Sequence, residues 1–245
     1  MRRPNRSVSQ VAPEGLTGTQ ELLAGSPLSV QTYERIREAI FSRQFEPGSR
    51  MKLQHLADLY DVSLTAVREA LARLQSEGLV TLRPHVGYSV VGLSVERLLE
   101  LTEARVGLES LAIQAAIEKG DVAWESEVLA SHHRMASQPM FVEGSLAISD
   151  SWAECHKDFH ETIAEGCRNR YVLAARSALY DESELYRRWS MPASTGDRDV
   201  AAEHKEIMRA VLDRDSERAT SLMSEHIWRT TSVIVDASSR WPIQD

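Results

Sequence analysis

Cysteine is scarce in this sequence, which has only two in 245 residues. Cys155 and Cys167 lie twelve positions apart in a region of helical periodicity, and this spacing forms neither a disulfide framework nor a Cys-x-x-Cys metal or redox motif. We therefore expect two ordinary thiols, buried or half-buried. Since 42% of the residues are hydrophobic, the chain has enough apolar material for a substantial core.

Long apolar runs are also absent, because no stretch approaches the roughly 20 residues of a membrane-spanning helix. The first residues, Met1 to Arg6, are followed by Ser, Gln, Pro, Glu and Gly instead of the apolar segment of a secretory signal peptide. We therefore expect a cytoplasmic protein that has no membrane partner.

The chain as a whole lacks the excess of positive charge that is typical of nucleic-acid-binding proteins, since its formal net charge is −8. The charge is unevenly distributed, however. Residues 1–92 contain 11 Lys and Arg against 9 Asp and Glu, whereas residues 93–245 contain 17 against 27. An N-terminal module with basic residues on one face is therefore compatible with DNA phosphates, with the acidic remainder turned away from the duplex.

The N-terminal third has the pattern of a winged helix-turn-helix. Residues 1–28 are rich in Ser, Gly, Pro, Thr and Gln, so we expect a flexible arm. A domain over residues 29–92 follows, in which apolar spacing predicts three helices and then a β-hairpin, the wing. The helices are expected at about residues 30–41, 53–60 and 64–77, and the strands at 79–83 and 88–91.

Residues 93–238 have helical periodicity almost throughout. Six helices are expected to begin near residues 94, 122, 145, 169, 197 and 215. Because strand signals are missing from this region, we expect an all-helical bundle that serves effector binding and dimerisation, followed by a C-terminal tail at 239–245. The predicted fold is therefore mainly α, with an N-terminal winged helix-turn-helix and a C-terminal helical bundle.

The start of the third helix has the residue types of a DNA-reading helix. In a helix-turn-helix this end enters the major groove, and here it carries Ser63, Thr65 and Arg68. A structural alternative stays open for two of them: Ser63 is also a suitable helix cap, and Arg68 is within reach of an ion pair with Glu69 or Asp61. The wing, with Arg83-Pro-His-Val-Gly87 at its tip, is placed to enter the neighbouring minor groove.

The ordered run from Pro47 to Val80 resembles the DNA-binding domain of the GntR family of regulators, and the resemblance extends over about residues 29–92. It implies that the operator is contacted by Gln54, Ser63, Thr65, Arg68, His85 and Gly87. Two positions differ from the pattern: Leu64 stands where the family usually has Arg, and Ala66 where its FadR branch usually has Pro. The usual operator half-site is therefore in question, since a bidentate Arg to guanine carries about 1–3 kcal/mol of discrimination.

Four histidines in the helical region form a candidate metal site. The stretch His156-Lys-Asp-Phe-His160 places two imidazoles at i and i+4 on one helix face, a spacing that suits one transition metal ion. His204 and His226 lie on two later amphipathic helices. A lone histidine is more often a core or surface residue, but neutral imidazoles that converge in a core need partners, and a metal supplies one.

The C-terminal region also resembles the ligand-binding domain, of the FCD type, of the FadR branch. The resemblance covers about residues 94–238 and rests on Glu103 to Glu109, Asp158 to Asn169, Glu203 to Ile207 and His226. In metal-binding members, an Asp-x-x-x-His pair and two later histidines hold the ion. Here His160, His204 and His226 match, but His156 stands at the Asp position. This four-nitrogen set favours Zn²⁺ or Ni²⁺ over ions that prefer oxygen ligands.

The same resemblance implies that a small carboxylate metabolite completes the coordination of the metal. Arg105 matches a position that is usually Arg, and its guanidinium suits the carboxylate of such an effector. The alternative for Arg105 is an intrahelical pair with Glu109 or Glu100 on a solvated face.

The expected function is that of a homodimeric transcriptional repressor whose affinity for double-stranded operator DNA depends on the metabolite. One alternative is a metal-sensing regulator with the ion itself as effector. The other is a metallohydrolase, but the zincin motif needs Glu where this chain has Lys157. Since a Gly-rich phosphate loop, a Ser-His-Asp signature and a cofactor motif are missing as well, we expect no enzyme.

Overall fold

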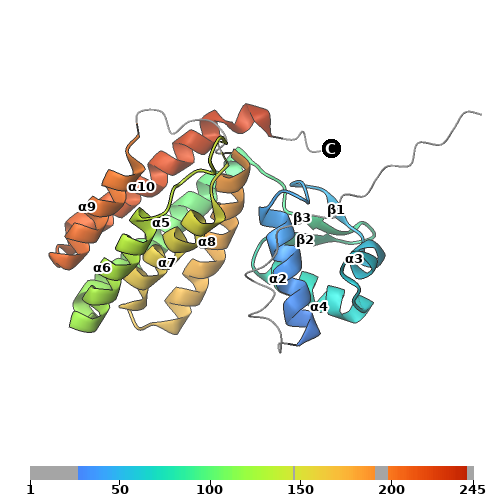
Figure 1. The fold of residues 1–245 in the computed structure, drawn as a ribbon, viewed down its shortest axis with the longest axis horizontal. Coiled ribbons are helices and arrows are strands. Elements are labelled where there is room, and N and C mark those ends of the chain that lie inside the picture. The colour runs from blue at the N-terminus through green and yellow to red at the C-terminus, as the bar shows by residue number, and fades with distance from the viewer. Residues whose placement is uncertain (1–26, 146, 191–197, 242–245) are drawn as a thin grey trace, which may run out of the picture.

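The computed structural model describes residues 27–145, 147–190 and 198–241, as a smaller N-terminal module beside a helical bundle (Figure 1). The arm expected over 1–28 therefore lies outside the described residues, apart from its last two. Leu28 of that segment is the first residue of a helix. The mainly α fold, with a winged helix-turn-helix followed by a helical bundle, is confirmed.

The module contains α2 (Leu28–Phe41), α3 (Leu53–Tyr60) and α4 (Leu64–Ser76). Each helix buries the apolar stripe that its spacing predicts, and the side chains of Ile36, Leu56 and Leu71 are fully buried. Asp61, in the left-handed region with φ 53°, ends α3. The α3–α4 turn is therefore short, as a helix-turn-helix requires.

The wing is part of a three-stranded antiparallel sheet in the order β1-β3-β2. β2 (Val80–Arg83) pairs with β3 (Gly87–Val90) as predicted, in the register Thr81 opposite Ser89. The additional strand β1 (Arg50–Met51) pairs with β3 and was missed by the sequence analysis. Two residues are too short for a period-two pattern, so only the tertiary pairing reveals this strand.

Among the residues that the structure describes, the bundle contains six α-helices, most of which begin close to the predicted positions. They are α5 (Val95–Lys119), α6 (Val122–Ala136), α7 (Asp150–Glu165), α8 (Arg170–Ser190), α9 (Val200–Leu212) and α10 (Ser216–Asp236), and a short 3₁₀ helix, η1 (Ser238–Arg240), follows. The prediction for α7, near residue 145, was wrong. Phe141 and Ile148 form an isolated β-bridge, and Ser149 caps the helix by accepting a hydrogen bond from the N–H of Trp152.

The module and the bundle share one of the two apolar cores. The buried residues of the module, such as Ile40 and Leu74, lie in one cluster with Leu98, Leu185 and Tyr186 of the bundle. The second core is enclosed by the bundle alone and includes Phe159 and Ile207. A shared core means that the module and the bundle are in direct mechanical contact.

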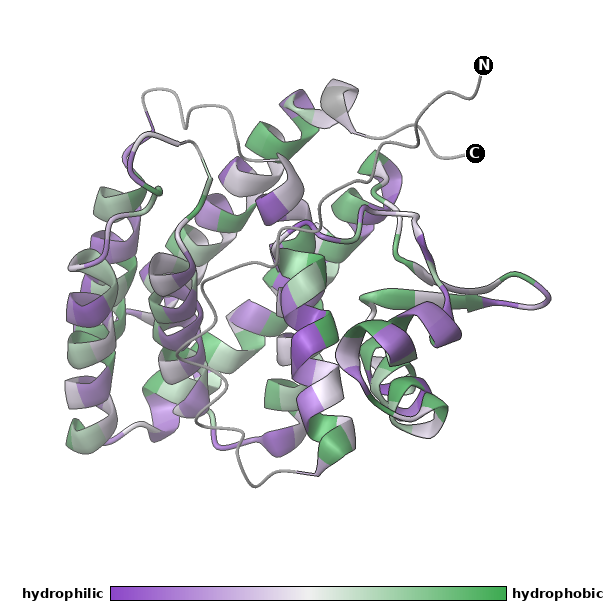
Figure 2. Ribbon diagram, turned by 45° about the vertical axis from the view of Figure 1, so that its right-hand side comes forward, coloured by the Kyte–Doolittle hydropathy of each residue, from purple (hydrophilic) through white to green (hydrophobic). Residues whose placement is uncertain are grey.

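The end of the described chain packs against the bundle. The ring of Trp241 lies 5.7 Å from that of Tyr186, and its indole N–H donates to the hydroxyl of Ser190. Polar and apolar residues alternate around the helices (Figure 2). In the described part of the chain, no helix is both long enough and apolar enough to cross a membrane.

Candidate functional site

The residues expected to read DNA lie at exposed positions of the module. Thr65 and Arg68 are exposed in the first turns of α4, and Arg68 makes no ion pair within the described part of the chain. Ser63 is exposed and also caps α4, since its hydroxyl accepts a hydrogen bond from the N–H of Ala66 at 3.2 Å. Gln54 is exposed near the start of α3, where its amide donates to Asp58.

The tip of the wing lies in the turn between β2 and β3. His85 is exposed and adopts a left-handed φ of 63°, and Gly87, with φ 96°, has open space where a Cβ would stand. The backbone at the tip is therefore able to approach a ligand closely.

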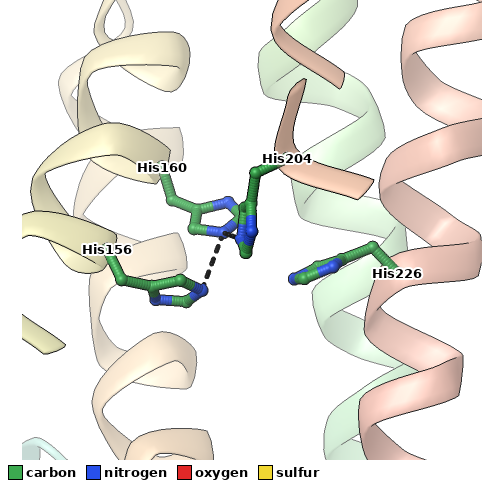
Figure 3. A group of neighbouring side chains, drawn as sticks. All are labelled: His156, His160, His204 and His226. Atoms are coloured by element: carbon green, nitrogen blue, oxygen red, sulfur yellow. Dashed lines mark hydrogen bonds between the residues drawn. The ribbon is translucent and has the colours of Figure 1, made fainter. Parts of the chain in front are cut away.

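The four histidines of the candidate metal site do converge. His156 and His160 project from α7, His204 from α9 and His226 from α10, and their rings surround one point (Figure 3). All four are buried, with 1–7% of their surface exposed, and offer one ligand atom each within 4.8 Å of one another. Four buried imidazoles from three helices are rarely brought together without a function.

The spacing of the ring nitrogens fits a tetrahedral metal site. Nε2 of His160 lies 3.2 Å from Nε2 of His156 and 3.3 Å from Nε2 of His204. Zinc–nitrogen bonds of about 2.0–2.1 Å in a tetrahedron place the nitrogens about 3.3–3.4 Å apart. The widest separation, 4.8 Å, is longer than this edge, so one ligand has to move inward when the site closes on an ion.

The outer contacts of two histidines direct their free nitrogens at the centre. Nδ1 of His204 donates to the carbonyl of Val200 at 2.8 Å, and Nδ1 of His226 donates to the carboxylate of Glu203 at 2.8 Å. Because a carbonyl and a carboxylate only accept, Nε2 of both rings carries the lone pair that a metal needs. Burial opposes ionisation of Glu203, but hydrogen bonds from Arg198 and His226 outweigh it and hold the pKa of this carboxyl well below its usual range.

Burial favours the neutral form of the histidines, which is the form that a metal ion would require. Burial is the main cause that lowers the pKa of each imidazole below 6.5, and the neighbouring rings or guanidinium groups lower it further. His156 also bonds through Nδ1 to the phenol of Tyr180 at 2.8 Å, and the guanidinium of Arg187 lies 3.3 Å from the same nitrogen. A cation this close to a metal ligand favours an anion at the centre.

Three arginines lie beside the histidines, around Tyr180. The guanidinium carbons of Arg105, Arg187 and Arg176 lie 5.4, 5.6 and 5.8 Å from the centre of its ring. Arg105 is not on the solvated face that the alternative required: its side chain is 13% exposed, 4.0 Å from Glu109, and burial lowers its pKa to about 10. The structure thus places Arg105 next to the candidate metal site.

Sequence reasoning missed Tyr180, Arg176 and Arg187. A signal existed, because these positions of α8 are spaced by four and seven residues and therefore share one face of the helix. Charged residues on a helix usually face water, however, so the spacing alone did not distinguish these arginines from those of a solvated surface.

A small cavity and a surface groove adjoin the histidines. A small cavity lined by Trp152, His156, Arg187, Arg198 and His226 touches the cluster. It shares Arg198 and His226 with a groove of about 640 Å³ between α9 and α10. Asp158, by contrast, faces away from the cluster and pairs with Arg134 at 2.8 Å.

Comparison with known proteins matches two parts of the chain to described families. Residues 28–90 match the family described as bacterial regulatory proteins, gntR family, and residues 100–229 match the FCD domain. The HTH-type transcriptional repressor GlaR of Escherichia coli (strain K12) is 31% identical over 213 residues, covering 85% of this chain and 96% of its own. The HTH-type regulator BphR of Paraburkholderia xenovorans (strain LB400) is 29% identical over 231 residues, covering 94% and 92%.

Solved structures support the fold. E. coli McbR/YncC superposes with a TM-score of 0.69 at 19% identity, over 86% of this chain and 98% of its own. A GntR regulator from Rhodococcus sp. RHA1 superposes with a TM-score of 0.67 at 21% identity, over 85% and 98%. At this level of identity the likeness concerns the arrangement of the elements alone.

Proposed function

The chain belongs to the GntR family of bacterial transcriptional regulators and carries an FCD domain, and from this premise we propose that it is a metal-dependent repressor that releases its operator when a small carboxylate binds in the bundle. Its relatives are regulators, not enzymes. Lys157, in the position where a zincin needs Glu, pairs with Asp181 at 2.9 Å, and a hydrolytic role is not retained.

One observation carries the metal part of the proposal. Four neutral imidazoles from three helices meet with two nitrogen–nitrogen distances of 3.2 and 3.3 Å, close to the edge of a tetrahedral site. The set contains nitrogen and no oxygen ligand, which favours Zn²⁺ or Ni²⁺ over Mg²⁺ and Ca²⁺. His156, His160, His204 and His226 would hold the ion, which would supply a Lewis-acidic site for the effector.

The buried arginines support a carboxylate effector. Arg105 and Arg187 lie near the histidines, and a guanidinium forms two parallel hydrogen bonds with a carboxylate. An effector that binds both the metal and a guanidinium therefore has to carry an anionic oxygen group.

Helix α8 is suited to transmit the change to the module. Its residues Tyr180 and Arg187 contact His156. Asp181, which follows Tyr180 in the chain, accepts a hydrogen bond from Arg37 of α2 at 2.9 Å. A Cβ at Gly78, just beyond the recognition helix α4, would lie 2.9 Å from the carboxylate of Glu182. A small shift of α8 would therefore move the module and alter the match of two recognition helices to two half-sites in a homodimer.

We assign operator contacts to Gln54, Ser63 and Thr65, to Arg68, and to His85 and Gly87 of the wing. Their exposure on the two helices and at the hairpin tip supports this assignment. Binding of two copies to an inverted repeat follows from the small area that a single module offers.

The test combines metal analysis with operator binding. Purified protein is expected to contain about one Zn²⁺ or Ni²⁺ per chain, and carboxylates are expected to weaken its operator complex in a gel shift only while the metal is present. His204→Ala should lose both the metal and the response, whereas His133→Ala, at an exposed position of α6, should keep both. A metal-free protein with an unaltered response would overturn the proposal.

A metal-sensing regulator is the second candidate. One observation favours it: four protein nitrogens fill a tetrahedral site without any effector oxygen, as in closed structural sites. Titration of operator affinity against the metal and against carboxylates in parallel distinguishes the two. A response to the metal alone would favour the sensor.

A further inference from the structure

The arginines around Tyr180 carry more charge than their buried partners neutralise. Arg176 bonds Glu109 at 2.8 Å, and both side chains are 2% exposed. Within the described part of the chain, the one ion pair of Arg105 is the distant contact with the same Glu109, at 4.0 Å. Arg187 pairs with Glu184. Three guanidinium groups are therefore matched by two carboxylates.

Arg187 shares its partner Glu184 with a second arginine. Glu184 also bonds the guanidinium of Arg188 at 2.7 Å. With four neutral histidines, a divalent metal ion would add two further positive charges beside the arginines. Because an uncompensated charge in a buried site is costly, a ligand with at least two negative charges would balance the excess positive charge of this region.

Unsatisfied hydrogen-bond donors lie in the same place. In the described part of the chain, several buried side-chain nitrogens have no partner, among them Nε of Arg105, Nη2 of Arg176 and Nε of Arg187. Arg176 and Arg187 are 3% and 8% exposed, so bulk water does not satisfy them. Buried donors of this kind are rare in folded proteins unless a ligand or an ordered water completes them.

Two sets of anion-binding groups therefore lie around one aromatic ring. The rings of His156 and His160 lie 6.2 and 6.3 Å from that of Tyr180, and the guanidinium carbon of Arg105 lies 5.4 Å from it. We infer that the effector is a short-chain dicarboxylate, with one carboxylate at the histidine cluster and the other at Arg105 and Arg176. This inference rests on the proposed function, whose effector is a carboxylate of any kind.

The first experiment compares ligands that differ only in the second carboxylate. Calorimetric titration of the zinc-loaded protein uses the saturated dicarboxylates from malonate to adipate, each paired with the monocarboxylate of the same carbon number. A charge-assisted hydrogen-bonded pair corresponds to about 10- to 100-fold in affinity, so one dicarboxylate should bind at least about tenfold tighter than its monocarboxylate. Chelation of the zinc should weaken both members of a pair.

The second experiment assigns the second carboxylate to the arginines. Arg105→Gln should reduce the preference for the dicarboxylate to about twofold or less, because the affinity for the dicarboxylate falls more than the affinity for the monocarboxylate. Arg105→Lys, which keeps the charge but loses the fork, should retain part of the preference. Arg134→Gln is the control, because Arg134 is exposed on α6, where it pairs with Asp158.

The outcomes separate the inference from the proposed function. Equal affinity for the two members of every pair, together with zinc-dependent binding of monocarboxylates, would overturn the dicarboxylate and leave the proposed function standing. A preference that persists in Arg105→Gln would overturn the assigned position of the second carboxylate. If no carboxylate of either series binds, the proposed effector class fails as well.

Discussion

The DNA-binding module and the helical bundle place their functional residues in opposite environments. The module exposes Thr65 and Arg68 on a helix whose other face forms the core. The bundle buries its functional groups, with His204 at 1% and Arg176 at 3% exposure. We therefore expect function and stability to be separable in the module, whereas in the bundle the side chains proposed to bind ligands also affect the stability of the fold.

The metal-free bundle should lose stability in acid, which is the largest effect we expect. The fold keeps the four imidazoles neutral through lowered pKa values, while the unfolded chain protonates each near 6.5. Below about pH 6.5 the unfolded state binds more protons, so the free energy of unfolding falls until the pH reaches the lowered values.

The slope approaches about 1.4 kcal/mol per pH unit for each histidine, and integrated between pH 6.5 and 5.5 the loss is at most about 1 kcal/mol per histidine, or roughly 4 kcal/mol for all four. Urea denaturation of chelator-treated protein at several pH values measures it. The zinc-loaded protein serves as control, since the metal competes with protons for the same nitrogens. A stability that does not change over this interval would contradict the prediction.

The second-largest effect on stability is expected when Arg176 is replaced. Arg176→Met leaves Glu109 buried without its close partner, and breaking a buried pair in this way costs about 3–5 kcal/mol. Denaturation with urea gives the free energy of unfolding. The matched control is Arg134→Met, which removes an exposed ion pair and should cost less than about 1 kcal/mol. Similar losses for the two variants would show that burial does not distinguish these pairs.

Arg68→Ala should show the opposite behaviour in the module. Operator binding should weaken by about 1–3 kcal/mol if the guanidinium contacts a base. The fold should be nearly unaffected, because this exposed side chain has no ion pair to lose within the described chain. The stability should change by less than about 0.5 kcal/mol. A gel-shift titration and thermal unfolding test the two parts, with Arg134→Ala as control. Unaltered operator affinity would remove Arg68 from the reading surface.

Ser63 combines two roles, the cap that stabilises α4 and the proposed contact with DNA. Ser63→Ala removes the cap of α4 and should cost about 1 kcal/mol of stability, together with operator affinity. Ser63→Asp keeps a good capping group but places a negative charge near the phosphates, so stability should be retained while operator binding falls. If Ser63→Asp binds DNA like the parent, Ser63 is a cap only.

The elements were largely predictable, and the exceptions have physical reasons. Val122 begins α6 as expected, because Asp121 caps it and the apolar period is regular. The strand Arg50–Met51 is too short to leave a pattern, and the bridge between Phe141 and Ile148 depends on a contact across a loop. Local sequence patterns predict long periodic helices well, but they do not predict strand pairings between short, separate segments.

The histidines show how far the candidate site was predictable. His156 and His160 share a face because they are one turn apart, which any helix guarantees. That His204 and His226 join the same site is not guaranteed by spacing along one helix; it was inferred from their positions on two later amphipathic helices and from the resemblance to the FCD domain. Their directions depend on Val200 and Glu203, which orient the rings through Nδ1.

The order of the helices, the hairpin wing and the exposed residues proposed to read DNA were all predictable from the sequence, because those features depend on residues close together in the chain. Only the tertiary structure decided that Arg105, Arg176 and Arg187 surround Tyr180 beside the histidines. Whether a charged residue faces water or the interior depends on which helices cover its face. That covering is a property of the packed bundle, not of any local segment.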